Sequence, residues 1–128
     1  MPNLLRNRRV LVVEDEFILA DELSRELAEA GATVLGPAAS VDDALTLLAQ
    51  SDEVDAAAID LNLDGSFAYG VADLLTRHGV PFMFTTGYDR EAMPDRYADV
   101  PRSEKPLATG EVARRLAEMV RERPLAQA

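Results

Sequence analysis

The chain has 128 residues, the size of one ordinary domain, and its 13 basic and 23 acidic side chains give a formal net charge of −10. This charge disfavours electrostatic binding to nucleic acid or to an anionic membrane. The lack of cysteine removes disulfides, thiolate zinc sites and thiol catalysis. Because no apolar run is long enough to span a membrane and no secretory signal precedes the first strand, we expect a cytoplasmic protein.

The first part of the chain alternates strand and helix. Residues 10–13 form an apolar, β-branched run that predicts a strand. Apolar residues at helical spacing then predict a helix that ends at Gly31. A second strand is expected at residues 33–36. Ser40, with Asp43 three residues later, predicts the N-cap of a second helix.

The middle of the chain repeats this alternation. The run Ala56–Ile59 contains no polar residue, which indicates a strand buried on both faces, and it ends on Asp60. The polar residues that follow predict a turn, and apolar residues at helical spacing predict a third helix at residues 71–78. A fourth strand is expected at residues 80–85, with Pro81 among its first residues, where no ladder hydrogen bond is needed.

The last part completes the pattern. Pro94 interrupts residues 89–100, so a fourth helix should be short or irregular. A brief fifth strand is expected at residues 100–103, and Thr109 is expected to cap a last amphipathic helix that stops near Pro124. Five alternations predict parallel strands with helices on both faces. We therefore expect one three-layer α/β/α domain over residues 1–128, with its core at about residues 8–122.

Polar side chains follow the ends of several expected strands, where open parallel sheets form their ligand crevice. They are Glu14, Asp15, Asp60, Thr85, Thr86 and Lys105. If the first strand lies beside the third, three carboxylates share a pocket, and they would raise each other's pKa unless a cation bridged them. Hard oxygen ligands without histidine or cysteine suit Mg²⁺. A nucleophilic carboxylate with a metal, an ammonium and a hydroxyl is what phosphoryl transfer requires.

Each of these features alone has a simpler explanation. Acidic residues that open a helix complement its dipole, a carboxylate after a strand is commonly a turn residue, and a lysine before proline is commonly solvated. Their occurrence together in one alternating chain favours the functional interpretation. His78, the single histidine, is expected at a helix end, and the glycines form no phosphate-binding loop for ATP.

The segments VLVVEDE, AAIDLNLDG, FTTG and EKP, in this order and spacing, resemble the receiver domain of bacterial two-component response regulators. The resemblance covers essentially the whole chain. It implies a (βα)5 fold with a five-stranded parallel sheet in the flavodoxin-like order 2-1-3-4-5. It further implies that Asp60 accepts a phosphoryl group from a histidine kinase or phosphotransferase. Asp15 would ligate Mg²⁺ directly, and Glu14 would act through a water molecule.

The same resemblance implies roles for three more residues. Asn62 would offer its backbone carbonyl to the metal, and Lys105 would pair with a phosphoryl oxygen. The Lys105-Pro106 bond would be cis, as only X-Pro bonds commonly are. Thr86 would hydrogen-bond another phosphoryl oxygen and act as the switch; it is preferred to Thr85 because small Gly87 follows it and leaves room for the phosphoryl group.

Two departures from the common receiver pattern stand out. Arg102 occupies the position, three before Lys105, where many receivers have a tyrosine or phenylalanine that swings inward. The segment PFMFTTGY resembles instead the FATGUY group of single-domain receivers of α-proteobacteria, with Tyr88 directly after the glycine. We therefore expect the segment around Pro94, rather than a threonine–aromatic pair, to reorder on activation.

The expected function is that of a stand-alone phosphoacceptor that signals by protein contact or acts as a phosphate sink, without a DNA-binding output domain. It would assist its own phosphorylation and dephosphorylation rather than turn over as an enzyme, and act as a monomer or weak homodimer. One alternative is a Mg²⁺-dependent phosphohydrolase that uses an aspartyl-phosphate, although Asn62 stands where such enzymes need a second aspartate. Another is a pseudo-receiver that only binds partners, which would have no use for the complete polar set.

Overall fold

A computed structural model describes residues 3–51, 53–63, 65–87 and 93–121. Its central sheet has five parallel strands, β1 (Arg9–Val13), β2 (Thr33–Ala38), β3 (Ala56–Asp60), β6 (Phe82–Thr86) and β7 (Arg102–Glu104). They lie in the order β2-β1-β3-β6-β7, which confirms the flavodoxin-like order expected from the resemblance. The described α-helices are α1 (Phe17–Glu29), α2 (Val41–Gln50), α3 (Tyr69–Arg77) and α4 (Glu111–Val120).

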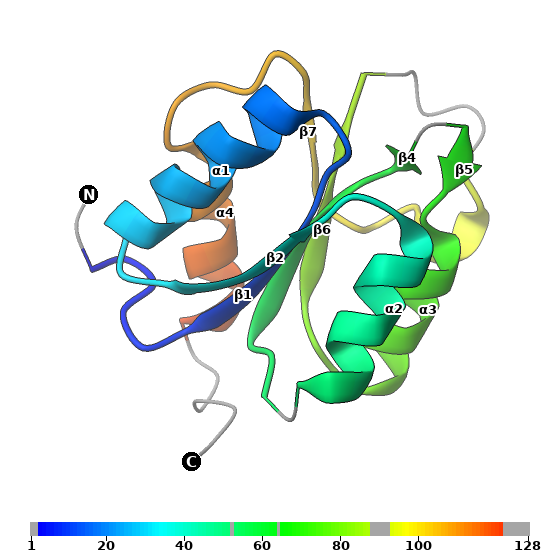
Figure 1. Ribbon diagram of the computed structural model, residues 1–128, viewed down its shortest axis with the longest axis horizontal. Coiled ribbons are helices and arrows are strands. Elements are labelled where there is room, and N and C mark those ends of the chain that lie inside the picture. The colour runs from blue at the N-terminus through cyan, green and yellow to red at the C-terminus, as the bar shows by residue number, and fades with distance from the viewer. Residues whose placement is uncertain (1–2, 52, 64, 88–92, 122–128) are drawn as a thin grey trace.

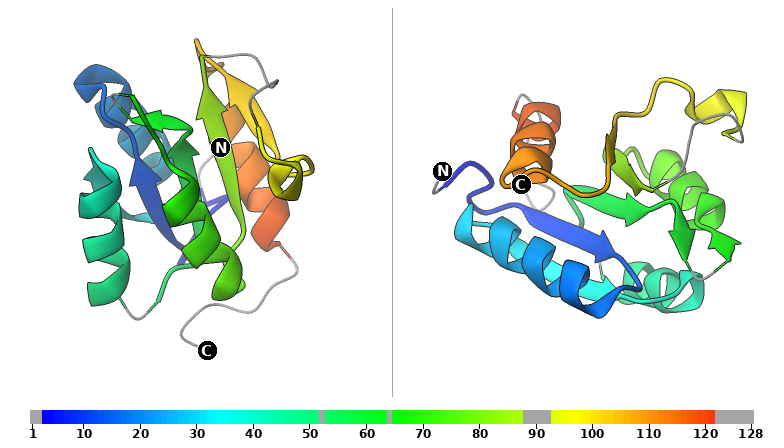
Figure 2. Two further views of the ribbon diagram at one scale, coloured as in Figure 1. Left: turned by 90° about the vertical axis from the view of Figure 1, so that its right-hand side faces the viewer. Right: turned by 90° about the horizontal axis from the view of Figure 1, so that it is seen from above.

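The helices cover both faces of the sheet, α1 and α4 on one and α2 and α3 on the other (Figures 1 and 2). Alternate strand residues point to opposite faces, so β1 contributes to both cores. Val10 and Val12 pack toward α1 and α4, whereas Leu11 and Val13 pack toward α2 and α3. The predicted three-layer arrangement is confirmed. No helix in the described residues has both the length and the apolar character needed to cross a bilayer.

Several local predictions are confirmed. Ser40 is the N-cap of α2, and its hydroxyl accepts a hydrogen bond from the amide of Asp43 at 3.0 Å. Between β6 and β7, the described residues contain only a short 3₁₀ helix, η2 (Asp95–Tyr97), which begins directly after Pro94. A proline at that position ends regular α-helix to its N-terminal side.

Two local predictions are wrong. The residues after Asp60 form more than a turn, because β4 (Asn62–Leu63) pairs antiparallel with β5 (Ser66–Phe67). Gly65, with φ +90°, provides the left-handed backbone of the hairpin loop.

The N-cap of α4 is Gly110 rather than Thr109. The capping group comes from α1, where the Glu26 carboxylate accepts hydrogen bonds from the amides of Gly110 at 2.9 Å and Ala113 at 3.1 Å. These contacts join residues more than 80 positions apart, so no local pattern around Thr109 indicates them. The expected stop at Pro124 lies outside the described residues.

Candidate functional site

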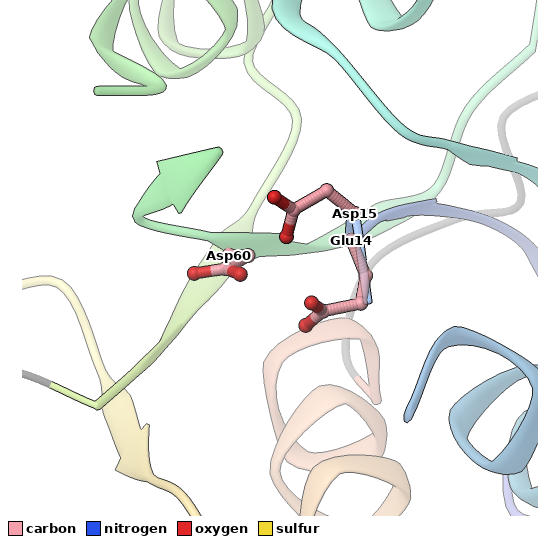
Figure 3. Close-up of side chains that lie close together, drawn as sticks. All are labelled: Glu14, Asp15 and Asp60. Atoms are coloured by element: carbon pink, nitrogen blue, oxygen red, sulfur yellow. The ribbon is translucent and has the colours of Figure 1, made fainter. Parts of the chain in front are cut away.

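The ends of β1 and β3 bring three carboxylates together. The two strands are neighbours in the sheet, as expected, and Val13 pairs with Ile59. Glu14 and Asp60 therefore follow side by side at the carboxyl edge. Figure 3 shows the side chains of Glu14, Asp15 and Asp60 clustered there, and one carboxylate oxygen from each lies within 4.8 Å of the others.

Asp60 is the last residue of β3 and is only 5% exposed. Both of its carboxylate oxygens have donors. Oδ1 accepts a hydrogen bond from the amide of Asn62 at 3.1 Å, and Oδ2 accepts one from Nζ of Lys105 at 2.9 Å. These contacts fix the direction of the carboxylate, which is necessary for a group that must meet a reacting atom in line.

Lys105 directly follows β7 and bridges two acids. Its amide donates to the carbonyl of Thr86 at 2.9 Å, which holds the residue beside the end of β6. Its Nζ lies 2.9 Å from Oδ2 of Asp60 and 3.0 Å from Oε1 of Glu14. Burial lowers the pKa of Lys105, but the hydrogen bonds to the two carboxylates outweigh it and leave the pKa raised. The Lys105-Pro106 bond is cis, as expected.

Glu14 is more deeply buried than its expected role through a water molecule would suggest, with 2% exposure. Its Oε2 accepts a hydrogen bond from the amide of Glu16 at 3.1 Å. Oε1 lies near Nζ of Lys105 but is not in hydrogen-bonding direction to it or to any other described residue. Burial raises the pKa of Glu14 to about 7, although the Glu16 amide and Lys105 both act to lower it.

Asn62 and Thr86 lie at the edges of the cluster. The side chain of Asn62 turns toward the hairpin loop, where its Oδ1 accepts a hydrogen bond from the amide of Gly65 at 2.8 Å. Thr86 is the last residue of β6 and is 2% exposed. Thr85 pairs with Asp60 in the register of the sheet, so Thr86 is one position further toward the carboxyl edge. Tyr88 lies outside the described residues.

The donor set fits a small, hard divalent cation. All three clustered side chains offer carboxylate oxygens, and the buried Oε1 of Glu14 lacks a hydrogen-bond donor among the described residues. A bound cation would compensate the negative charge of the cluster, which among the described residues only Lys105 offsets. Oxygen ligands without nitrogen or sulfur favour Mg²⁺ over transition metals. The roles of Asp15, Glu14 and Asn62 toward such an ion stay predictions.

Tyr97 has a structural role that the sequence does not indicate. Its ring is 3% exposed and stacks on Tyr69 at a centroid distance of 5.9 Å, while its hydroxyl donates to Oδ1 of Asp73 on α3. The Nη2 group of Arg102 lies 3.4 Å from the carbonyl oxygens of Tyr97 and Ala98. Arg102 therefore anchors η2 from β7. The contacts of Tyr97 with Tyr69 and Asp73 join residues more than 20 positions apart, so no local sequence pattern indicates them.

No protein-family model and no curated protein matches the chain, but solved structures do. SdrG from Sphingomonas melonis Fr1 is 32% identical, with a TM-score of 0.76, over 88% of this chain and 96% of that one. The response regulator REC domain of PhyR from Erythrobacter litoralis is 25% identical, with a TM-score of 0.78, over 94% of this chain and 97% of that one. A response regulator receiver protein from Sinorhizobium medicae WSM419 is 20% identical, with a TM-score of 0.80, over 91% of this chain and 97% of that one, and it bears on the fold alone.

Proposed function

Since the chain belongs to the receiver domains of two-component response regulators, we propose that it takes up a phosphoryl group on Asp60 from a phosphohistidine donor. The phosphorylated chain would then signal by contact with another protein or drain phosphate from the donor. The observation that carries this proposal is the convergence of Lys105, Glu14 and Asp15 on the buried Asp60 carboxylate. Residues 1–128 would act as a single receiver domain.

In the proposed reaction, a carboxylate oxygen of Asp60 attacks the phosphorus of the donor. A P–O bond forms as the P–N bond of phosphohistidine breaks, and the electron pair of that bond returns to the imidazole nitrogen of the donor. The two hydrogen bonds to Asp60, from Asn62 and Lys105, hold the carboxylate in one orientation before the donor arrives. Positioning of this kind, together with electrostatic stabilisation of the transferred group, supplies most of the catalysis in phosphoryl transfer.

Lys105 and Thr86 are proposed to bind the oxygens of the transferred group. The ammonium of Lys105 already lies 2.9 Å from Asp60, so it can turn to a phosphoryl oxygen attached to that carboxylate without a large movement. The raised pKa of Lys105 keeps it cationic across the physiological range. Thr86, at the end of the neighbouring strand β6, would donate its hydroxyl to another oxygen and report the modification.

We assign the proposed Mg²⁺ to the carboxylates of Asp15 and Asp60 and the backbone carbonyl of Asn62, with Glu14 acting through a water molecule. When bound, Mg²⁺ would neutralise negative charge on the phosphoryl group. Glu14 lies beside Asp60 at the same edge of the sheet. Above its pKa of about 7 it is negatively charged, so Lys105 is then held between two carboxylates.

Receiver domains generally signal rather than turn over substrates, and one contact argues for the same role here. In a phosphohydrolase, an acid two residues after the nucleophile would protonate the leaving group. At that position this chain has Asn62, an amide whose oxygen is engaged by Gly65 in the hairpin loop. Asn62 therefore lacks the acidic proton that this task requires, and its side chain is held toward the hairpin loop.

The test is phosphotransfer from a panel of purified, ³²P-labelled histidine kinases to the full chain. Asp60→Asn should abolish uptake of the label, and Lys105→Met should strongly reduce it. Glu29→Gln is a matched control, because Glu29 is exposed at the end of α1, at the opposite edge of the sheet from Asp60. Undiminished labelling of the Asp60→Asn chain would refute the proposal.

A further inference from the structure

At the end of the sheet opposite Asp60, the N-terminal turn packs beside the second half of α4. Figure 1 shows the turn in blue beside the end of α4 in orange. Between them lies a cavity of about 450 Å³ whose lining includes Arg6, Arg8, Arg114 and Arg121. We call this cavity the arginine pocket. Its volume falls within the range of about 300–1,000 Å³ that is typical of small-molecule sites.

The charge of the arginine pocket is opposite to that of the chain. The whole sequence carries −10, yet four of its 13 basic side chains line this one cavity, and among the described residues of the lining only Glu118 is acidic. At physiological ionic strength, charges farther than about 8 Å away are largely screened. A ligand in the pocket therefore experiences mainly the local positive charge.

Three of these arginines lack a counter-ion in the described parts of the chain. The guanidinium groups of Arg6, Arg114 and Arg121 form no ion pair or side-chain hydrogen bond there, although acidic residues are abundant. Elsewhere on the helices, exposed arginines do pair with acids, as Arg115 does with Glu111 at 3.3 Å. Unpaired cations gathered around one cavity are what an anion-binding site requires.

Arg8 has a different part in the pocket. Its Nη2 donates to the carbonyl of Val120 at 2.8 Å, and its Nη1 lies 3.6 Å from the carboxylate of Asp55. Val120 ends α4, where the negative end of the helix dipole would repel an anion. By binding that carbonyl, Arg8 offsets the repulsion and fixes the wall of the pocket, while the other three arginines stay available to a ligand.

We propose that the arginine pocket binds a small organic phosphate of nucleotide size. The planar fork of a guanidinium matches two phosphate oxygens at once, which explains why arginine rather than lysine suits this site. The apolar part of the wall, to which Leu4 and Ala117 contribute, suits a base or another flat organic group. Leu4 is 39% exposed, so it has apolar surface to offer.

The experiment is a titration of the ¹⁵N-labelled full chain with ADP at about 0.15 M salt, followed by NMR and calorimetry, with no phosphodonor present. We expect saturable binding with a Kd below about 1 mM and shifts centred on residues 3–8 and 114–121. Inorganic phosphate and adenosine should each bind at least about tenfold more weakly than ADP. Equal affinity for inorganic phosphate, or no saturable binding of ADP, would overturn the proposal.

Three variants separate the pocket from the general charge of the chain. The double change Arg114→Gln and Arg121→Gln should weaken ADP binding at least about tenfold. Arg115→Gln removes one positive charge from the same helix outside the pocket lining and should leave the affinity unchanged. Glu118→Gln should tighten binding, which misfolding could not imitate. If Arg115→Gln lowered the affinity for ADP as much as the double change, or if Glu118→Gln weakened ADP binding, the arginine pocket would not be the binding site. Because Asp60 takes no part in the titration, this proposal and phosphoryl acceptance can fail separately.

Discussion

Replacing Glu14 with glutamine should remove a pH dependence of stability that the metal-free chain shows near neutrality. Glu14 is 2% exposed, and its pKa rises from 4.5 to about 7 in the folded state, chiefly because burial penalises the charged form. In the unfolded chain the same carboxyl titrates near its ordinary value. Between these two pKa values the folded chain therefore holds a proton that the unfolded chain has lost.

Proton linkage determines whether the free energy of unfolding rises or falls with pH. A carboxyl group that is more basic in the folded state stabilises the fold fully below pH 4.5, and this contribution is lost as pH rises through about 7. At about 1.4 kcal/mol per pH unit, the whole effect is about 3 kcal/mol. Above the folded-state pKa the slope from this group disappears.

Urea denaturation at intervals from pH 4.5 to pH 8 in EDTA measures the effect. The difference in unfolding free energy between the native chain and Glu14→Gln cancels the contributions of the other titrating groups. As pH rises from 4.5 to 8, the native chain should lose about 3 kcal/mol of unfolding free energy relative to the variant. A difference that stays constant with pH would refute the reasoning, because Glu14 would then titrate normally in the folded chain.

Three further measurements test other contacts. Lys105→Met leaves two buried carboxylates without their cation, so the unfolding free energy should fall by about 3–5 kcal/mol at pH 8 and by less at pH 5, in the same urea assay. Removal of Mg²⁺ by EDTA should lower the unfolding midpoint of the native chain at pH 8 but hardly change that of Asp15→Asn, because Asp15 is the exposed ligand in the proposed set. Glu26→Gln should destabilise the chain by about 1 kcal/mol and speed hydrogen exchange of the first amides of α4, since it weakens the carboxylate cap at that end.

The layers were predictable because they depend on patterns within short segments, whereas the strand order was expected only from the resemblance to receiver domains. Ala56–Ile59 reads as a strand because both of its faces are buried, and β1 has the same character. The cap of α4 was not predictable, because Glu26 reaches it from another helix. The hairpin after Asp60 had a local signal, the Asp64-Gly65 pair between two short segments, which is typical of tight hairpin loops.

The grouping of site residues was also accessible from the sequence, since strand ends of a parallel sheet meet at one edge. What the sequence could not give is the environment of each side chain. Glu14 and Asp15 are adjacent acids, yet one is buried and the other exposed. Lys105 lies within 3.0 Å of both buried carboxylates, a contact that depends on how β7 leads into the next loop. Those differences set the raised pKa of Glu14 and so its chemistry.

The segment between β6 and β7 is where the sequence predicted rearrangement, and the structure defines what such a change must break. The described part of that segment is tied to α3 through the hydroxyl of Tyr97 and to β7 through Arg102, which approaches two carbonyl oxygens of η2. Tyr97 also packs on the rings of Phe82 and Phe84 in the core. Because the ring is buried, its release would expose apolar surface as well as break a hydrogen bond. A switch that moves η2 must therefore replace these contacts rather than simply loosen a loop. The contacts of Arg102, which stands in place of the common aromatic residue, are among those that must break.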